Sequence, residues 1–225
     1  MAVRFNAATD AYSASNGAPG GSAYSGVLWA YCLANPGGGS VLYLAATSGG
    51  NAWYLCTNLA GDTLYLADDN VGAGGIPFTL NTWWQLGFVV SGTAVALWAG
   101  TLGNTPTKYT TTSVSAIIPT RLYIGSDEWG GWWDSRVAGV KLWNVALTDS
   151  QVLAEFTQFK PVSTAGLLRY HRFTSASTAD DSGLGNILTA GSTPTDTEAD
   201  PPGVPEILIL PPWQPNTARR RAANL

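Results

Sequence analysis

The sequence predicts an all-β protein: two antiparallel sheets packed as a jelly-roll sandwich, with one short α-helix near residues 148–158. Three observations predict this class. Short apolar runs alternate with polar residues at the period of two that strands show. Glycine contributes 26 residues and tryptophan 10, while charged residues make up 12%, which suits many tight turns around an aromatic core. Only one segment, at Thr148–Gln151, carries a strong signal for the start of a helix.

The first half of the chain reads as a meander of short strands. Residues 7–26 read as a loop with room for one short strand, and the hairpin of residues 85–98 turns at Ser91-Gly92. Because no helix of crossover length separates successive strands, antiparallel pairing is favoured over a parallel sheet. The Gly-rich residues 72–75 lack the Lys-Ser/Thr and helix of a phosphate loop, so they are expected to form an ordinary loop. The expected strands are residues 3–5, 27–34, 41–46, 52–57, 63–67, 85–90 and 94–98.

The second half adds strands at residues 121–124, 137–143 and 167–173, and the helix. Thr148 and Gln151 form a Thr-x-x-Gln capping box, in which each residue satisfies a backbone N–H of the first turn. Apolar residues follow at helical spacing, and Lys160-Pro161 is expected to stop the helix.

These motifs resemble the closing part of laminin-G-like domains of the concanavalin A-like lectin/glucanase superfamily, which include pentraxin-like members. The matching residues, in order, are Ile124-Gly125, Val140, Trp143-Asn144, Ala146-Leu147 and the box at Thr148–Gln151, although an acidic residue usually ends that box. The hairpin of residues 82–100 and the turn of residues 181–186 also resemble the family. The resemblance covers roughly residues 1–195 and implies the sandwich, a binding role and, in some relatives, bound calcium.

Charge and hydropathy narrow the classes of function. The formal net charge is −4, and residues 1–218 carry eight bases against fifteen acids, so the body is not expected to bind nucleic acid. No apolar stretch is long enough for membrane insertion, and the N-terminus lacks the pattern of an ordinary secretion signal.

Catalysis is not expected. Glucanases of this superfamily place carboxylates as Glu-x-Asp-x-x-Glu along one strand, because glycosyl transfer needs an acid and a nucleophile close together. The glutamates of this chain, Glu128, Glu155, Glu198 and Glu206, do not have that spacing. His171 has no nucleophile motif near it and is interpreted as a structural or surface histidine.

The best binding candidate is the loop between the strands at 121–124 and 137–143. Sugars present C–H faces that stack on aromatic rings and hydroxyls that bond to carboxylates. The predicted glycan-binding residues are Trp129, Trp132, Trp133, Asp127 and Asp134. The alternative is that Trp132 or Trp133 folds into the core and the acids are solvated.

Calcium is a second possibility, because it takes six to eight oxygen ligands and loop carboxylates supply them. Asp68, Asp69, Asp127 and Glu128 are the predicted ligands, and Asp180-Asp181 is a third acidic pair. Turn capping by each pair is the alternative that the composition favours. Cys32 and Cys56 read as two buried thiols, with a disulfide as the alternative.

Residues 196–225 differ in kind and are predicted to be a Pro-rich C-terminal arm beyond a jelly-roll domain of residues 1–195. An exposed apolar run flanked by prolines would aggregate, so it is expected to be covered by its own body or by a neighbour. The predicted assembly residues are Ile207, Leu208, Ile209, Leu210 and Trp213.

The sequence therefore favours a non-enzymatic glycan-binding or adhesive module. The absence of an export signal suggests a structural, decoration or tail-associated protein of a phage virion, whose arm grips other virion proteins or its own copies as a homo-oligomer. The alternatives are a secreted, lectin-like bacterial protein and a glycoside hydrolase with an unusual carboxylate pair such as Asp127 with Asp134.

Overall fold

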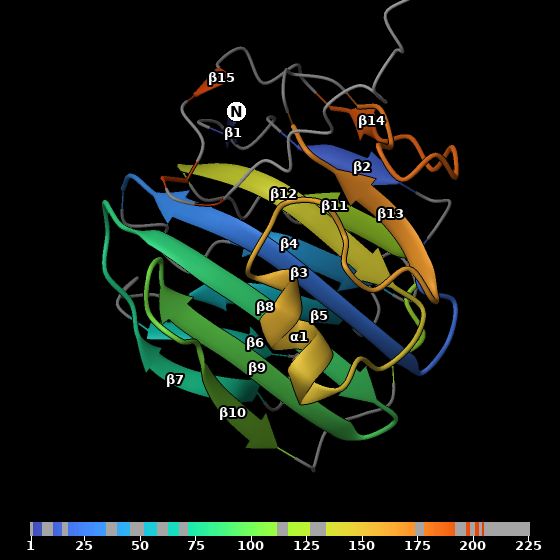
Figure 1. The fold of residues 1–225 in the computed structure, drawn as a ribbon, viewed down its shortest axis with the longest axis horizontal. Coiled ribbons are helices and arrows are strands. Elements are labelled where there is room, and N and C mark those ends of the chain that lie inside the picture. Colours follow the sequence, from blue (N-terminus) through green and yellow to red (C-terminus); the bar gives the residue numbers. More distant parts are fainter. Residues whose placement is uncertain are drawn as a thin grey trace, which may run out of the picture.

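The computed structural model is a two-sheet antiparallel sandwich with one short helix, as the sequence predicts (Figure 1). The residues that the structure describes are 2–5, 11–14, 18–34, 40–45, 52–57, 63–67, 72–111, 117–126, 134–173, 178–191, 197–198, 201–202 and 204.

One sheet has eight strands in the order β10-β9-β8-β3-β12-β1-β15, and β13 pairs with the second half of β12. Every pairing in it is antiparallel. Its strands are β1 (Ala2–Phe5), β3 (Ala23–Cys32), β8 (Trp83–Ser91), β9 (Ala94–Thr101), β10 (Thr107–Thr111), β12 (Ser135–Trp143), β13 (Leu167–His171) and β15 (Thr197–Glu198).

The other sheet has seven strands in the order β14-β2-β11-β4-β5-β6-β7, also antiparallel. Its strands are β2 (Tyr12–Ala14), β4 (Ser40–Ala45), β5 (Ala52–Thr57), β6 (Thr63–Ala67), β7 (Gly72–Pro77), β11 (Arg121–Ile124) and β14 (Thr189–Ala190).

The core lies between the two sheets, because alternate residues of each strand point inward. Leu28, Leu86 and Phe88 of the eight-stranded sheet belong to the same buried cluster as Leu55 and Leu122 of the other sheet. We call the inward side of the eight-stranded sheet its inner face. Burial of this cluster supplies the main driving force for folding.

The opposite side of the eight-stranded sheet, its outer face, carries a second buried cluster and the helix α1 (Asp149–Glu155), which lies in front of that sheet in Figure 1. Gly87 of β8 permits this approach, since a Cβ there would come within 2.8 Å of the Phe156 ring. The second cluster comprises Ala2, Val27, Trp29, Trp83, Val89, Ala96, Trp98, Ala138, Trp143, Leu147, Val152, Phe156 and Phe159.

The predicted capping box is present. Thr148 Oγ1 accepts from the Gln151 backbone N at 3.3 Å, and the Thr148 N–H donates to Gln151 Oε1 at 2.9 Å. The helix ends at Glu155 with Phe156 as its C-cap, several residues before Lys160-Pro161. The predicted helix was therefore right in place and too long at its C-terminal end.

Two other expectations about elements were wrong, and one strand was missed. Residues 72–75 form the start of β7, which pairs with β6, and are not a loop. Strand β10 was not predicted, although it pairs with β9 over five residues. The β8–β9 turn is Gly92-Thr93, one residue later than expected, because Ser91 pairs with Ala94 and Gly92 takes the positive φ of 61°.

The start of the predicted arm lies on the body. Strand β15, residues 197–198, pairs with β1 at the edge of the eight-stranded sheet. Pro201 is buried, and Val204 packs against the second cluster. No helix among the described residues is long and apolar enough to cross a membrane.

Candidate functional site

Most of the predicted ligand residues lie outside the described part of the chain. These are Trp129, Trp132, Trp133 and Asp127 of the glycan loop, and Asp68, Asp69, Asp127 and Glu128 of the calcium prediction. The predicted assembly residues Ile207, Leu208, Ile209, Leu210 and Trp213 also lie outside it. Asp134 is described, and so are the two ends from which residues 127–133 leave the sandwich.

Those ends are held firmly. Arg4 Nε lies 3.2 Å from Asp134 Oδ1, and the Leu33 N–H donates to the Asp134 carbonyl at 2.7 Å. Gly125 has a φ of 87°, and any side chain there would collide with the Phe5 ring. The loop therefore starts and ends on fixed backbone, and the Asp134 carboxylate that the sequence offered as a sugar ligand is already engaged by Arg4.

A row of large side chains crosses the outer face next to the base of this loop. Trp83, Tyr31, Arg136 and Arg4 are successive cross-strand partners on β8, β3, β12 and β1, so they share one face of the sheet. The Tyr31 and Trp83 rings lie 5.4 Å apart, and Arg136 Cζ lies 5.1 Å from the Tyr31 ring centre. We call these four residues the aromatic–arginine row.

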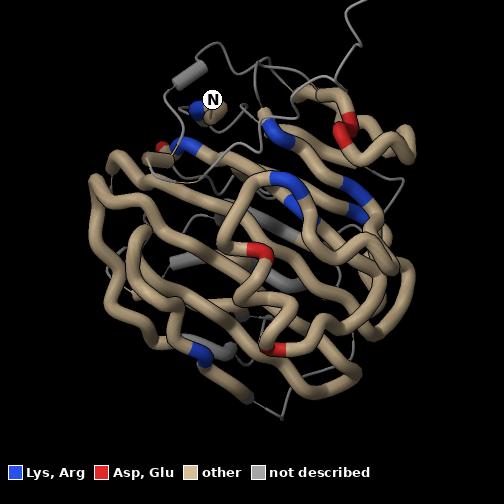
Figure 2. The backbone as a smooth tube through the Cα atoms, viewed as in Figure 1, with Lys and Arg blue, Asp and Glu red and all other residues tan. Residues whose placement is uncertain are grey.

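The sequence alone does not indicate that these four residues lie in a row. Each strand shows its own alternation, but the row depends on the register between strands that are distant in sequence. Tyr31, Arg136 and Arg4 remain partly exposed, whereas Trp83 is 8% exposed. These three side chains therefore leave part of the row accessible on the outer face, although Arg4 is also engaged by Asp134. Lys and Arg positions occur on β1, β12 and β13, and charged positions are otherwise sparse along the backbone (Figure 2).

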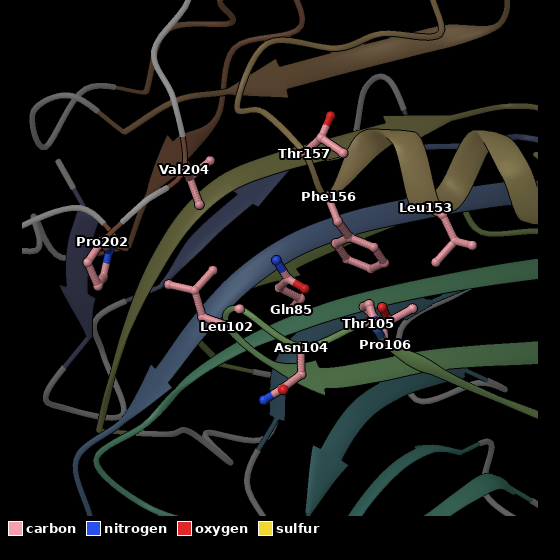
Figure 3. A pocket seen from close by; sticks show the side chains of 11 residues that line it. Gln85, Leu102, Asn104, Thr105, Pro106, Leu153, Phe156, Thr157, Pro202 and Val204 are labelled. Carbon is pink, nitrogen blue, oxygen red and sulfur yellow. The ribbon is translucent and has the colours of Figure 1, made fainter.

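A groove on the outer face adjoins the end of the row, because Leu102 follows β9 opposite Trp83 and its N–H donates to the Trp83 carbonyl at 2.8 Å. The groove is an open hollow of about 590 Å³. One wall comes from residues 102–106 and another from α1 and the residue after its cap, as Figure 3 shows. The third wall is Pro202 and Val204.

The floor of the groove is the side chain of Gln85, which is 8% exposed and points into the hollow (Figure 3). Neither its amide N–H groups nor its carbonyl oxygen is hydrogen-bonded to a side chain or backbone group of the described residues. The Gln85 amide is not among the buried polar groups that lack a partner, so its atoms are accessible from the hollow and can bond to water or to a ligand.

The α1 wall is fixed by a buried ion pair. Lys141 Nζ donates to Glu155 Oε2 at 2.9 Å and to the carbonyls of Glu155 and Gln158 at 2.8 and 2.7 Å. Glu155 Oε1 in turn accepts from the Ser163 N–H at 2.6 Å. Burial lowers the pKa of Lys141 to about 8, partly opposed by the charge of Glu155. All three ammonium donors are satisfied, so the helix is locked on the sheet.

The other titratable groups of interest have structural surroundings. His171 is fully buried, its Nδ1 lies 2.8 Å from the Ala179 carbonyl, and burial lowers its pKa to about 4. Asp180 accepts backbone N–H groups of Tyr170, Ser182 and Asn186. Burial opposes ionisation there, but these bonds outweigh it and lower the pKa of Asp180. His171 is structural, as expected, and Asp180 caps its turn.

Two further predictions concern metals and thiols. Among the described residues, no three His, Cys, Asp or Glu side chains converge as a metal site would require. Cys32 is a free buried thiol that donates to the Ala34 carbonyl at 2.8 Å, and burial raises its pKa to about 12. Cys32 is therefore not in a disulfide, and a thiol with that pKa is a poor nucleophile. The side chain of Cys56 lies outside the described residues.

Comparison with known proteins identifies the fold through structure and not through sequence. No protein-family model matches the chain, and no curated protein matches it in sequence. A candidate carbohydrate-binding protein from Bacteroides ovatus superposes with a TM-score of 0.59 at 14% identity, over 87% of this chain and 60% of its own.

Two larger proteins contain a similar domain. Trypanosoma rangeli sialidase superposes with a TM-score of 0.55 at 14% identity, over 70% of this chain and 27% of its own. Tailspike protein 2 of Escherichia coli O157:H7 bacteriophage CAB120 superposes with a TM-score of 0.53 at 13% identity, over 73% of this chain and 25% of its own. The chain spans less than two thirds of each of the three proteins. The shared fold agrees with the concanavalin A-like sandwich that the sequence motifs suggested.

Proposed function

We propose that this protein is a non-enzymatic module that binds glycans through the loop of residues 127–133 and the aromatic–arginine row beside it. The observation that carries the proposal is the partly exposed Tyr31 and Arg136 of the row, which lie beside Asp134, the residue at which the tryptophan-rich segment 127–133 rejoins the sheet. Indole and phenol rings offer flat apolar faces to sugar C–H groups, and Arg136 and Asp127 offer polar contacts to hydroxyls.

The comparisons support this proposal at the level of fold. The Bacteroides ovatus protein, a candidate for carbohydrate binding, shares the sandwich over most of this chain. Calcium held by Asp68, Asp69, Asp127 and Glu128 would be an accessory to the same site, and a chelator tests it.

We further propose that the module belongs to a phage virion, as a decoration or tail-associated protein that residues 196–225 attach to other virion proteins or to its own copies. The similarity to a bacteriophage tailspike protein supports this placement. A lectin-like secreted bacterial protein is the alternative, and it keeps the same binding site. Incorporation of purified protein into particles, with and without residues 205–225, separates the two.

A glycan array with Trp132→Ala, Tyr31→Ala and the full chain tests the binding site, run with and without a calcium chelator. We expect each substitution to weaken binding by about tenfold, equivalent to about 1.4 kcal/mol, while the melting temperature stays within a few degrees. Leu184→Ala, an exposed residue outside the row and the loop, serves as the matched control. Binding that survives both aromatic substitutions, or that is absent for the full chain, would contradict the proposal.

A further inference from the structure

The groove over Gln85 is a poor sugar site and a good peptide site. Its walls are mainly aliphatic, from Leu102, Pro106, Leu153, Pro202 and Val204. Phe156 is 5% exposed and so offers almost no ring face for a sugar to stack on. The lining residues carry no charge. Asn104, Thr105 and Thr157 add uncharged polar groups to the rim. These surroundings fit apolar side chains on a backbone that can bond to uncharged polar groups.

The amide of Gln85 has the chemistry of a peptide group. It offers an N–H donor and a C=O acceptor in one plane, so it can bond to both groups of an extended backbone. An extended segment with apolar side chains would pack against the aliphatic walls and bond to the Gln85 amide at the same time. Neither water nor a sugar would do both.

The chain itself supplies such a segment close to the groove. Val204 lines the groove and is half-buried against the outer cluster. Only Pro205 and Glu206 separate it from Ile207, Leu208, Ile209 and Leu210. Proline is favoured at the second position of a β-turn, so residues 204–207 can reverse the chain over the groove. A two-residue tether also gives an effective concentration in the millimolar range.

We propose that residues 207–210 dock into this groove of the same chain, with Gln85 bonded to their backbone. The apolar run that would otherwise promote aggregation is then covered. The base of the arm is anchored beside α1, and the residues from Pro211 onward are the part that reaches a partner. Docking of this segment does not depend on glycan binding. Because the assays below contain no glycan, the docking proposal and the glycan-binding proposal can each fail while the other holds.

Disulfide trapping in the full-length chain tests the contact. Leu153→Cys places a thiol on the groove wall, at a residue that is 37% exposed, and Leu208→Cys places the second in the segment. Under mild oxidation at micromolar protein we expect a disulfide within one chain, formed roughly 100-fold faster than links between chains, as the millimolar effective concentration implies. Cys32 is buried with a raised pKa and does not compete. All pairs are built in a Cys56→Ser chain, which removes the other native thiol.

Ile118→Cys with Leu208→Cys is the matched control, because Ile118 is 51% exposed and does not line the groove. Equal rates for the two pairs would show a free segment and overturn the proposal. Disulfide-linked dimers as the main product of the groove pair would also overturn it, since the occupant would then be a second copy.

A second measurement does not depend on cysteines. If Gln85 bonds to the docked segment, Gln85→Leu lowers the melting temperature of the full chain. Leu208→Asp releases the segment from the groove. In a chain that carries it, Gln85→Leu should no longer lower the melting temperature, because the amide that it removes then has no bond to the segment. Additive shifts from the two substitutions would contradict docking.

Discussion

The two faces of the eight-stranded sheet use the same strands for different purposes. On the inner face, Leu28, Leu86 and Phe88 pack against the other sheet without charged neighbours in their cluster. On the outer face, Trp29 and Trp143 share their layer with the buried Lys141–Glu155 pair. The inner face is mainly apolar, and its buried Arg169 and His171 lie on β13, opposite Leu142 and Val140. The outer face depends on an ion pair that holds α1 and shapes one wall of the groove.

The largest expected effect is on the inner face. Phe88→Ala should lower the free energy of unfolding by about 4 kcal/mol, because it removes a fully buried ring and leaves a cavity between the sheets. Val89→Ala, the next residue and on the outer face, is the control and should cost about 1.5 kcal/mol. Urea denaturation of both variants measures the difference, and equal losses would show that the faces do not differ in this way.

The outer face should respond to charge more than to volume. Glu155→Gln keeps the shape but leaves the Lys141 ammonium buried without a counter-charge, so we expect a loss of about 3 kcal/mol. The double variant Lys141→Met/Glu155→Leu removes both charges and should recover most of it, since a buried pair is often no better than apolar residues of similar volume. Denaturation curves for the single and double variants decide this, and a double variant as unstable as Glu155→Gln would refute it.

His171 qualifies the contrast, because β13 brings it beside the inner core, where it stacks on Phe173 at 5.8 Å. Its pKa is about 4 when folded and 6.5 when unfolded, so the unfolded chain binds the proton more readily between those values. Stability is therefore full above pH 6.5 and lost on acidification, by about 2 kcal/mol at pH 5 for a shift of this size.

The groups around His171 determine how far its pKa is lowered, and they suggest the control variant. Burial is the main cause of the lowered pKa, Arg169 adds to it, and Asp180 and Asp181 oppose it. His171→Asn keeps a donor for the Ala179 carbonyl and cannot titrate. The difference between the melting temperatures at pH 7.5 and pH 5 should therefore be smaller for this variant than for the wild-type chain. An unchanged pH dependence would show that His171 does not cause the acid sensitivity. Asp180 cannot cause it in this range, because a carboxyl whose pKa is lowered from 3.8 is ionised in both states at pH 5 and above.

The sequence predicted the elements whose signals are local and missed those that depend on pairing. Strands β5 and β6 were predicted to the residue, because β5 is a short apolar run and β6 alternates between buried and partly exposed residues. Strand β7 begins with glycines and carries no such pattern, and it exists because β6 offers it a partner. The aromatic–arginine row and the groove floor require cross-strand register and the landing site of α1, neither of which is encoded by nearby residues.

The smallest expected effect is at the most local feature, the capping box before α1. Thr148→Ala removes the acceptor for the Gln151 N–H and should cost about 1 kcal/mol. Thr148→Ser keeps the hydroxyl and is the control. Since Lys141 and Glu155 also hold the helix, the loss should grow in a Lys141→Met/Glu155→Leu chain, where the cap becomes its main polar anchor. Thermal denaturation of the four chains measures this coupling, and strictly additive losses would mean that cap and ion pair secure α1 independently.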